Sequence, residues 1–153
     1  MKNLNQIIKS LFIVSSLLFA TPSLFAEQKG VIVVSEDVNI DNLSKKELER
    51  IFLGKTTIWE NGKRIQIGLS TNNSEKTSHF FNDVIGKNQR RFKKYWLKIV
   101  FAGYGIAPKL FKNDKNAINY TKKQEGVIAF VTTDSIKNVQ GLKVISIDGK
   151  EYF

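Results

Sequence analysis

The chain has 153 residues, with 24 lysine and arginine residues against 14 aspartate and glutamate residues, so its formal charge is +10. It contains no cysteine, which excludes disulfides, thiolate metal sites, a cysteine nucleophile and a lipid-modified cysteine. With 42% hydrophobic and 25% charged residues, the composition is typical of a folded globular protein and not of a disordered chain.

Residues 1–26 have the pattern of a secretory signal peptide. Lys2 and Lys9 lie in or near a short polar start, and an apolar region follows at residues 11–20 (LFIVSSLLFA). That run is shorter than the roughly 20 apolar residues of a membrane-spanning helix, and no later segment is long and apolar enough. We therefore expect a periplasmic or secreted protein without a membrane span, formed by one domain at residues 27–153. Without the two leader lysines, this domain has 22 basic against 14 acidic residues, a charge of +8.

The first part of the domain predicts a strand followed by a helix. Residues 31–35 (VIVVS) form a continuous, mostly β-branched run, which indicates a buried strand. Ser44 and Glu47 have the spacing of a capping box, and Gly54 is the expected stop. The helix between them would bury Leu48, Ile51 and Phe52 on one face.

A second strand and two further helices are expected next. After an Asn61-Gly62 turn, apolar residues alternate with polar residues or glycine over positions 65–69. Ser74 is the expected N-cap of the second helix, and its apolar face consists of Phe80, Phe81, Val84 and Ile85. Asn88 opens the third helix, and its apolar stripe consists of Phe92, Tyr95, Trp96, Ile99 and Val100.

The last part of the domain predicts a loop, a shorter helix and two strands. The loop spans residues 103–108, and Asp114 is the expected cap of the helix. The strands are residues 127–131 (VIAFV) and 143–147. Because strands alternate with helices along the chain, the predicted fold class is α/β, with a mixed central sheet flanked by helices.

Three stretches carry a resemblance to a known family. They are residues 43–59 (LSKKELERIFLGKTTIW), 95–103 (YWLKIVFAG) and 124–131 (QEGVIAFV). Their order and spacing resemble those of the phosphate-type substrate-binding proteins of ABC transporters, which have the type 2 periplasmic binding protein fold. Full members of that family have two lobes that close on an anion. The resemblance implies that this chain covers one lobe and the strand leading into it.

The resemblance also indicates a ligand-binding loop. The family's anion loop reads approximately Arg-x-Asp-Gly-Ser-Gly-Thr before a helix, and residues 70–77 (STNNSEKT) take its place here. Thr77 matches the last threonine and Ser74 is a shifted serine, whereas the arginine position falls near Thr71 and is lost. The resemblance alone therefore does not imply that this chain binds phosphate.

The chemistry of this loop can also be judged without the family. A helix N-terminus favours anions through its unpaired N–H groups and its partial positive charge. Hydroxyl groups and one lysine add donors, so the candidate ligand-binding residues are Ser70, Thr71, Ser74, Lys76 and Thr77. The carboxylate of Glu75 would repel an anion at this position unless the side chain points outward. The competing interpretation is an ordinary capped helix with solvated polar residues.

The remaining motifs favour no catalytic or metal chemistry. His79 is the only histidine, the carboxylates are scattered, and no Gly-x-Ser-x-Gly motif is present. We therefore expect no enzyme, no cofactor and no metal. The third helix carries five basic residues, which are Arg90, Arg91, Lys93, Lys94 and Lys98. A nucleic-acid or membrane-surface patch is one interpretation of them, and a solvated helix face is the favoured one. We expect no nucleic-acid partner.

Two functional hypotheses remain. The leading one is a non-catalytic secreted domain that binds a small oxyanion such as phosphate weakly, in connection with phosphate ABC transport. The alternative is an envelope protein-interaction module that kept the fold and lost the ligand, docking on an envelope or transporter partner. A polar concavity near residues 70–77 would favour the first hypothesis, and a flat basic or apolar patch would favour the second.

Overall fold

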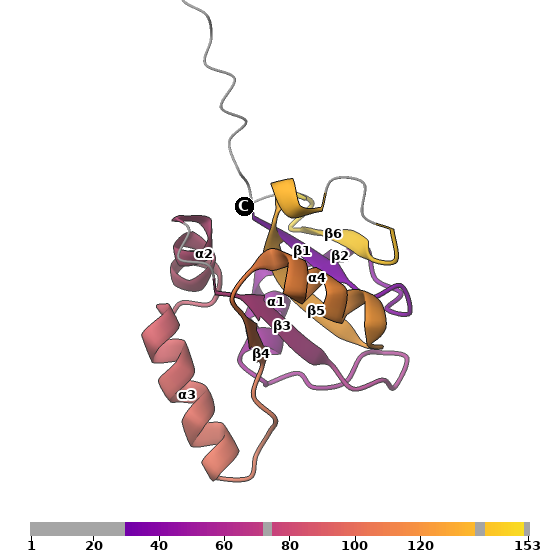
Figure 1. The fold of residues 1–153 in the computed structure, drawn as a ribbon. Coiled ribbons are helices and arrows are strands. Elements are labelled where there is room, and N and C mark those ends of the chain that lie inside the picture. The colour runs from indigo at the N-terminus through magenta and orange to yellow at the C-terminus, as the bar shows by residue number, and fades with distance from the viewer. Residues whose placement is uncertain (1–29, 72–74, 137–139, 152–153) are drawn as a thin grey trace, which may run out of the picture.

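The computed structural model describes residues 30–71, 75–136 and 140–151. These residues form one mixed sheet of six strands (Figure 1). The strands are β1 (Gly30–Val34), β2 (Asn42–Leu43), β3 (Gln66–Ser70), β4 (Lys109–Phe111), β5 (Val127–Thr132) and β6 (Lys143–Ile147). The α-helices are α1 (Lys45–Phe52), α2 (Glu75–His79), α3 (Gln89–Phe101) and α4 (Asp114–Lys123). A π-helical turn, η2 (Phe80–Val84), continues α2, and a 3₁₀ turn, η3 (Thr133–Ser135), follows β5.

The sheet has the strand order β2-β6-β1-β5-β3-β4. β1 runs antiparallel to both β5 and β6, whereas β3 runs parallel to β5 and β4. The carboxyl ends of β3, β4 and β5 therefore meet at one edge of the sheet, at Ser70, Phe111 and Thr132. This arrangement confirms the predicted α/β class and brings the predicted ligand loop, which follows β3, to that edge.

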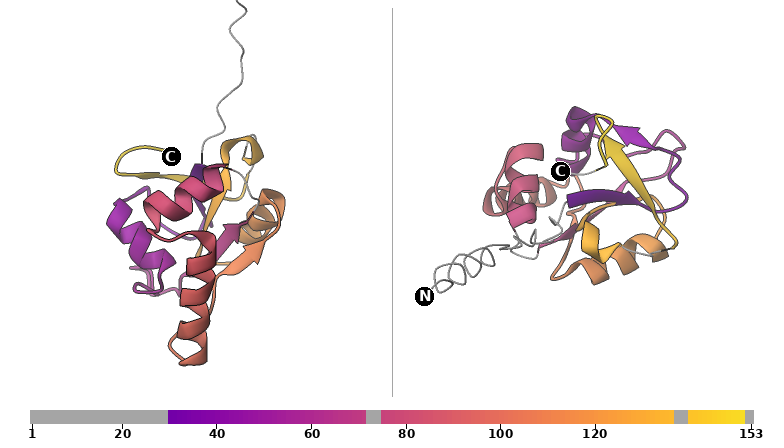
Figure 2. Two further views of the ribbon diagram at one scale, coloured as in Figure 1. Left: turned by 90° about the vertical axis from the view of Figure 1, so that its left-hand side faces the viewer. Right: turned by 90° about the horizontal axis from the view of Figure 1, so that it is seen from above.

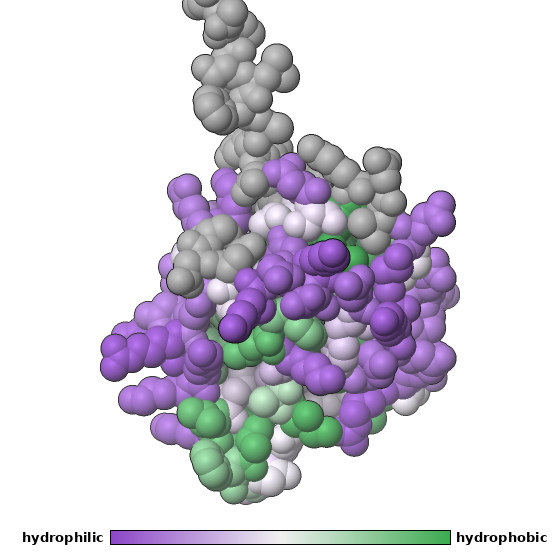
Figure 3. All heavy atoms as spheres, viewed as in Figure 1, coloured by the Kyte–Doolittle hydropathy of each residue, from purple (hydrophilic) through white to green (hydrophobic). Residues whose placement is uncertain are grey.

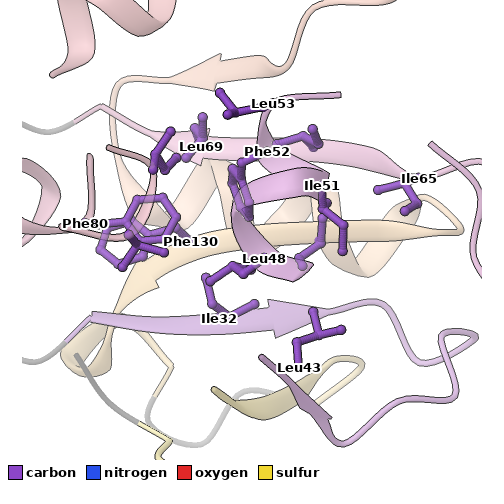
Figure 4. Close-up of a cluster of buried hydrophobic side chains, with 14 of the residues drawn as sticks. Ile32, Leu43, Leu48, Ile51, Phe52, Leu53, Ile65, Leu69, Phe80 and Phe130 are labelled. Carbon is purple, nitrogen blue, oxygen red and sulfur yellow. The ribbon is translucent and has the colours of Figure 1, made fainter. Parts of the chain in front are cut away.

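Helices cover both faces of the sheet, and the strands bury side chains on both. On one face, Ile32 and Phe130 pack with α1, η2 and α3 in the larger core cluster. On the other face, Val31 and Ala129 pack against α4 in a smaller cluster. Figure 4 shows the larger cluster, in which the Phe80 ring stacks on the Phe130 ring with a centroid separation of 4.1 Å.

The predicted helix caps are present at α1 and α3. The Ser44 Oγ accepts from the Glu47 N–H at 3.2 Å, and the Glu47 carboxylate accepts from the Ser44 N–H at 2.8 Å, which completes the capping box. The Asn88 side chain accepts from the Arg91 N–H at 2.9 Å. At α4 the prediction was wrong, because Asn113 is the N-cap and Asp114 is the first helical residue. Ser74, the predicted cap of α2, lies outside the described residues.

The apolar stripe of α3 is confirmed except at its last position. Phe92 and Trp96 are buried, while Tyr95 and Ile99 are partly buried against the same cluster. Val100 was predicted to be in the core, but 42% of its surface is exposed. Figures 1 and 2 show that the C-terminal end of α3 extends beyond the sheet.

The second helix differs from a regular α-helix in its second half. Over η2 the hydrogen bonds widen to five residues, as in the bond from the Ile85 N–H to the Phe80 carbonyl at 3.1 Å. Phe80 and Phe81 are both buried, as the apolar pattern predicts. The consecutive rings pack edge to face with a centroid separation of 6.0 Å.

Candidate functional site

The predicted ligand loop begins where β3 ends. Ser70 is the last residue of β3 and is fully buried, and its Oγ has no hydrogen-bond partner among the described residues. Gly68 and Gln66, two and four residues earlier, lie on the α4 side, because the Tyr120 hydroxyl of α4 donates to the Gln66 side chain and a Cβ at Gly68 would lie 3.5 Å from the Tyr120 ring. Strand alternation therefore directs the Ser70 hydroxyl toward the layer of α4.

Thr71 joins the ends of β3 and β4. Its backbone N–H and its hydroxyl both donate to the Phe111 carbonyl, at 2.8 and 3.1 Å. Because the hydroxyl proton is directed at Phe111, the Thr71 side chain can offer a ligand its lone pairs but not that proton. Thr71 therefore holds the loop at the sheet edge.

The other predicted ligand residues differ in exposure. Thr77 is fully buried within α2, Lys76 is partly exposed and Glu75 is exposed. Glu75 thus faces outward, as expected for an acidic residue in the first turn of a helix. Ser74 lies outside the described residues, so the structure places four of the five candidates.

A hydrogen-bonded cluster around one buried carboxylate lies at the same edge of the sheet. Asp114, at the start of α4, accepts hydrogen bonds from the Thr132 N–H at 3.1 Å, from the Thr132 hydroxyl and from the Ser135 hydroxyl at 2.8 Å. A carboxylate of the chain itself thus occupies the N-terminus of α4. Sequence reasoning missed this cluster, because it assigned Asp114 to a cap and no local pattern connects it with Thr132.

An open hollow of about 560 Å³ begins at Thr71 and runs along α3. It is lined by Thr71, Phe81, Gln89, Arg90, Phe92, Lys93, Lys94, Leu97 and Leu110. Three of these side chains are cations and none is a carboxylate. The hollow therefore brings a predicted ligand residue together with basic residues of the third helix. These two groups were not connected in the sequence analysis.

A second hollow, of about 450 Å³, lies at the opposite edge of the parallel strands. Among its lining residues are Arg64, Gln66, Lys109 and Tyr120. The Tyr120 hydroxyl donates to the Gln66 side chain at 2.7 Å, and burial raises the pKa of Tyr120, so that the phenol stays protonated. The Lys109 Nζ lies 4.6 Å from the centre of the Tyr120 ring. No local pattern in the sequence indicates this hollow.

The described part of the chain contains no cluster of three or more histidine, cysteine, aspartate or glutamate residues that would hold a metal ion. Within it, no helix has the length and apolar character needed to cross a membrane.

Comparisons with known proteins connect this fold with phosphate-binding proteins. No protein-family model matches the sequence, and no curated protein matches it. Among solved structures, PstS from Borrelia burgdorferi aligns with a TM-score of 0.60 and 16% identity, over 80% of this chain and 49% of that one. An ABC-type phosphate transport receptor from Vibrio cholerae aligns with a TM-score of 0.58 and 15% identity, over 79% of this chain and 46% of that one.

A third structure was determined with its ligand. It is a phosphate ABC transporter substrate-binding protein with bound phosphate from Clostridium perfringens, which aligns with a TM-score of 0.60 and 14% identity. The alignment covers 81% of this chain and 46% of that protein. The chain thus spans about half the length of the structures it matches. The likeness shows the fold, which is that of a lobe of a type 2 periplasmic binding protein.

Proposed function

We propose that this chain is a non-catalytic envelope protein that binds a small oxyanion of the phosphate class beside the carboxyl end of β3. The observation that carries the proposal is the hollow that Thr71 shares with Arg90, Lys93 and Lys94. It offers cations without a carboxylate among its lining residues, at the edge where the sequence predicts an anion loop. The fold, shared with a protein crystallised with phosphate, supports the same ligand class.

In this proposal the ligand residues have separate roles. Thr71 holds the start of the loop against β4, and it is the one predicted ligand residue among the described residues that lines the hollow. Lys76, which is partly exposed, and Ser74 remain candidate donors from the loop, whereas Ser70 and Thr77 are fully buried. The loop lacks the arginine of the family pattern. Arg90, on the first turn of α3, supplies a guanidinium from the other side of the hollow. A guanidinium can form two parallel hydrogen bonds with an oxyanion, which lysine cannot do.

The proposed binding is weak. The hollow is open to solvent, so each charged contact acts through water and contributes less than it would in a closed cleft. Added salt screens such an exposed site further. We expect a Kd on the order of 1 mM, or at best tens of micromolar.

A thermal-shift screen with phosphate, sulfate and small carboxylates tests this proposal. A ligand at ten times its Kd stabilises the native state by about 1.4 kcal/mol, which raises Tm by several degrees. Phosphate or sulfate should raise Tm in wild type and in Arg91→Gln, but not in Arg90→Gln. Arg91 is the matched control, because it is the next residue of the same helix and does not line the hollow. Equal shifts in the two variants would contradict the assignment of Arg90.

A second candidate function is docking on an envelope protein through the basic face of α3. The observation that favours it is the exposed surface of this helix, where basic side chains lie beside Leu97 and Phe101, which are 55% and 87% exposed. Cross-linking in the envelope fraction tests it. One specific adduct should form with wild type and be lost in Lys93→Glu/Lys94→Glu, and its persistence in that variant would argue against this surface.

A further inference from the structure

Among the described residues, the large apolar side chains with the highest exposed fractions lie at one end of the molecule. Phe101 is 87%, Tyr104 82% and Ile106 75% exposed, and we call these three residues the apolar tip. They belong to the last turn of α3 and to the loop after it. Figure 3 shows apolar surface gathered at the end of the molecule to which α3 and this loop extend in Figure 1. A contiguous apolar surface of this kind on a folded protein marks a contact with another phase or partner.

The backbone holds the apolar tip in place. The Gly103 N–H donates to the Val100 carbonyl and the Tyr104 N–H donates to the Ile99 carbonyl, both at 3.0 Å. Gly103 has a positive φ of 73°, so this is the hydrogen-bond pattern of a Schellman motif, which ends the helix sharply. At Gly105 a Cβ would lie 3.2 Å from the Ile99 side chain, so the loop packs closely against α3 there. Tyr104 and Ile106 on either side of it are exposed.

The outer face of α3 changes character along its length. Arg90, Lys94, Leu97 and Phe101 follow one another at intervals of three or four residues, so they share the face opposite the buried Phe92. The first two are basic and the last two are apolar. The face therefore runs from a positively charged beginning to the apolar tip.

The charge of this region has one sign only. Residues 84–113 contain eight basic residues and no acidic residue: Lys87, Arg90, Arg91, Lys93, Lys94, Lys98, Lys109 and Lys112. This number equals the net charge of +8 expected for residues 27–153, so the segment that carries the apolar tip accounts for the whole excess. Its complement is therefore a surface that is both apolar and anionic.

Helix geometry sets the depth of the basic residues behind the apolar tip. At a rise of 1.5 Å per residue, Lys98 lies about 4.5 Å, Lys94 about 10 Å and Arg90 about 16 Å behind Phe101 along the axis. Interfacial segments bury apolar side chains about 5–10 Å into the boundary between headgroups and acyl chains. If the axis of α3 is perpendicular to the bilayer and the apolar tip lies at that depth, Lys98 and Lys94 lie at the level of the lipid phosphates.

We propose that the apolar tip and the basic residues behind it dock this protein on the surface of a bilayer that contains anionic phospholipids. A lipid surface fits better than a second copy of the chain, because two such segments would place like charges against each other. A lipid surface also suits the protruding position of the apolar tip, because its three side chains are mostly exposed. The contact is peripheral. It shares Lys94 with the hollow beside Thr71, whereas Lys98, Phe101, Tyr104 and Ile106 do not line that hollow.

Vesicle co-sedimentation tests this proposal with the full chain. Wild type should bind vesicles of phosphatidylglycerol, bind vesicles of phosphatidylcholine much more weakly, and be released by salt. Lys94→Glu/Lys98→Glu should lower the partition coefficient by at least about fivefold per residue. Phe101→Ser/Ile106→Ser should lower it about tenfold or more, because the inserted apolar area is lost. All variants carry the same N-terminus, so differences between them come from the substituted residues.

A matched control and a depth measurement complete the test. Ile58 is 59% exposed and belongs to the turn region before β3, so Ile58→Ser removes an exposed isoleucine outside the apolar tip and should leave binding unchanged. The natural tryptophans, Trp59 and Trp96, are 7% and 5% exposed. In Phe101→Trp, the fluorescence of the new side chain should therefore be quenched by brominated phosphatidylglycerol more strongly than that of wild type.

Three results would each overturn the proposal. The first is wild type that fails to bind phosphatidylglycerol vesicles at low salt. The second is equal binding by the Phe101→Ser/Ile106→Ser and Ile58→Ser variants. The third is a wild-type dimer in solution that Phe101→Ser/Ile106→Ser makes monomeric, together with no lipid-dependent quenching at position 101. That last result would assign the apolar tip to contact between protein chains.

Discussion

The indole Nε1 of Trp96 donates a hydrogen bond to the backbone carbonyl of Phe52 at 3.1 Å. This contact joins the middle of α3 to the last residue of α1, and the neighbouring Tyr95 hydroxyl donates to the Leu53 carbonyl at 2.7 Å. The two bonds satisfy carbonyl groups that the end of a helix leaves without partners. Gly54 follows with a φ of 66°, and a Cβ there would lie 2.5 Å from the Trp96 ring. The helix stop and the aromatic stripe predicted from the sequence are therefore parts of one contact.

Trp96→Ala should lower the free energy of unfolding by about 3–5 kcal/mol, because it leaves a cavity beside Phe92 and removes the partner of the Phe52 carbonyl. Leu97→Ala, at the next position of the helix but 55% exposed, should cost less than about 1 kcal/mol. Urea unfolding of both variants measures the difference. Similar values for the two would show that α3 does not pack as described.

Asp37 should make stability depend on pH. Its carboxylate accepts from the Gly126 N–H at 3.0 Å and pairs with the Lys63 Nζ at 3.2 Å. Burial alone would raise the pKa of Asp37, but hydrogen bonds from Ser35, Lys63 and Gly126 outweigh it and hold the pKa below its usual value. A lowered pKa in the folded state stabilises the protein above the unfolded pKa of about 3.9, and this contribution is lost as pH falls through the folded value.

Asp37→Asn should therefore be less stable than wild type by about 1 kcal/mol at neutral pH, with the difference shrinking below about pH 4. Urea unfolding of both proteins across that range measures it. Asp41→Asn is the control, because the Asp41 carboxylate is exposed and pairs with the Lys143 Nζ at 3.5 Å. A difference between wild type and Asp37→Asn that persists unchanged in acid would mean that ionisation of Asp37 contributes nothing.

If residues 1–26 are a secretory signal peptide, as we expect, the mature N-terminus lies near Glu27. A polar start with Lys2 and Lys9, a short apolar run and Ala26 motivate this expectation. The intact mass of the protein recovered from the envelope fraction should correspond to loss of residues 1–26. Recovery of soluble protein that retains these residues would refute the expectation.

The sequence was most informative where the determining interactions are local. The capping box at Ser44 and Glu47 depends on four consecutive residues, and the alternation of Ile65, Ile67 and Leu69 directs these three side chains into the larger core cluster. Such patterns depend only on neighbours along the chain. For this reason the larger elements, and the α/β class that follows from their order, could be predicted.

The features that the sequence did not reveal depend on distant partners. β4 has three residues, of which Lys109 and Leu110 are exposed, and its strand conformation depends on parallel pairing with β3. The hydrogen bonds of Asp114 come from Thr132 and Ser135, which follow it by 18 and 21 positions. Val100 fits the apolar stripe of α3 by spacing, and only the length of the sheet decides that it is exposed. The hollow beside Thr71 likewise exists only because α3 lies next to β4.

We propose that a small oxyanion binds in the hollow between Thr71 and Arg90, and the proposed function depends most on this site. Calorimetric titration with phosphate at low salt, on wild type, Arg90→Gln and Arg91→Gln, tests it most directly. We predict a Kd on the order of 1 mM to tens of micromolar for wild type and Arg91→Gln, at least about tenfold weaker binding for Arg90→Gln, and weaker binding of all three as salt rises. Heats no larger than those of dilution for wild type at millimolar phosphate, or equal affinities in the two variants, would contradict the claim.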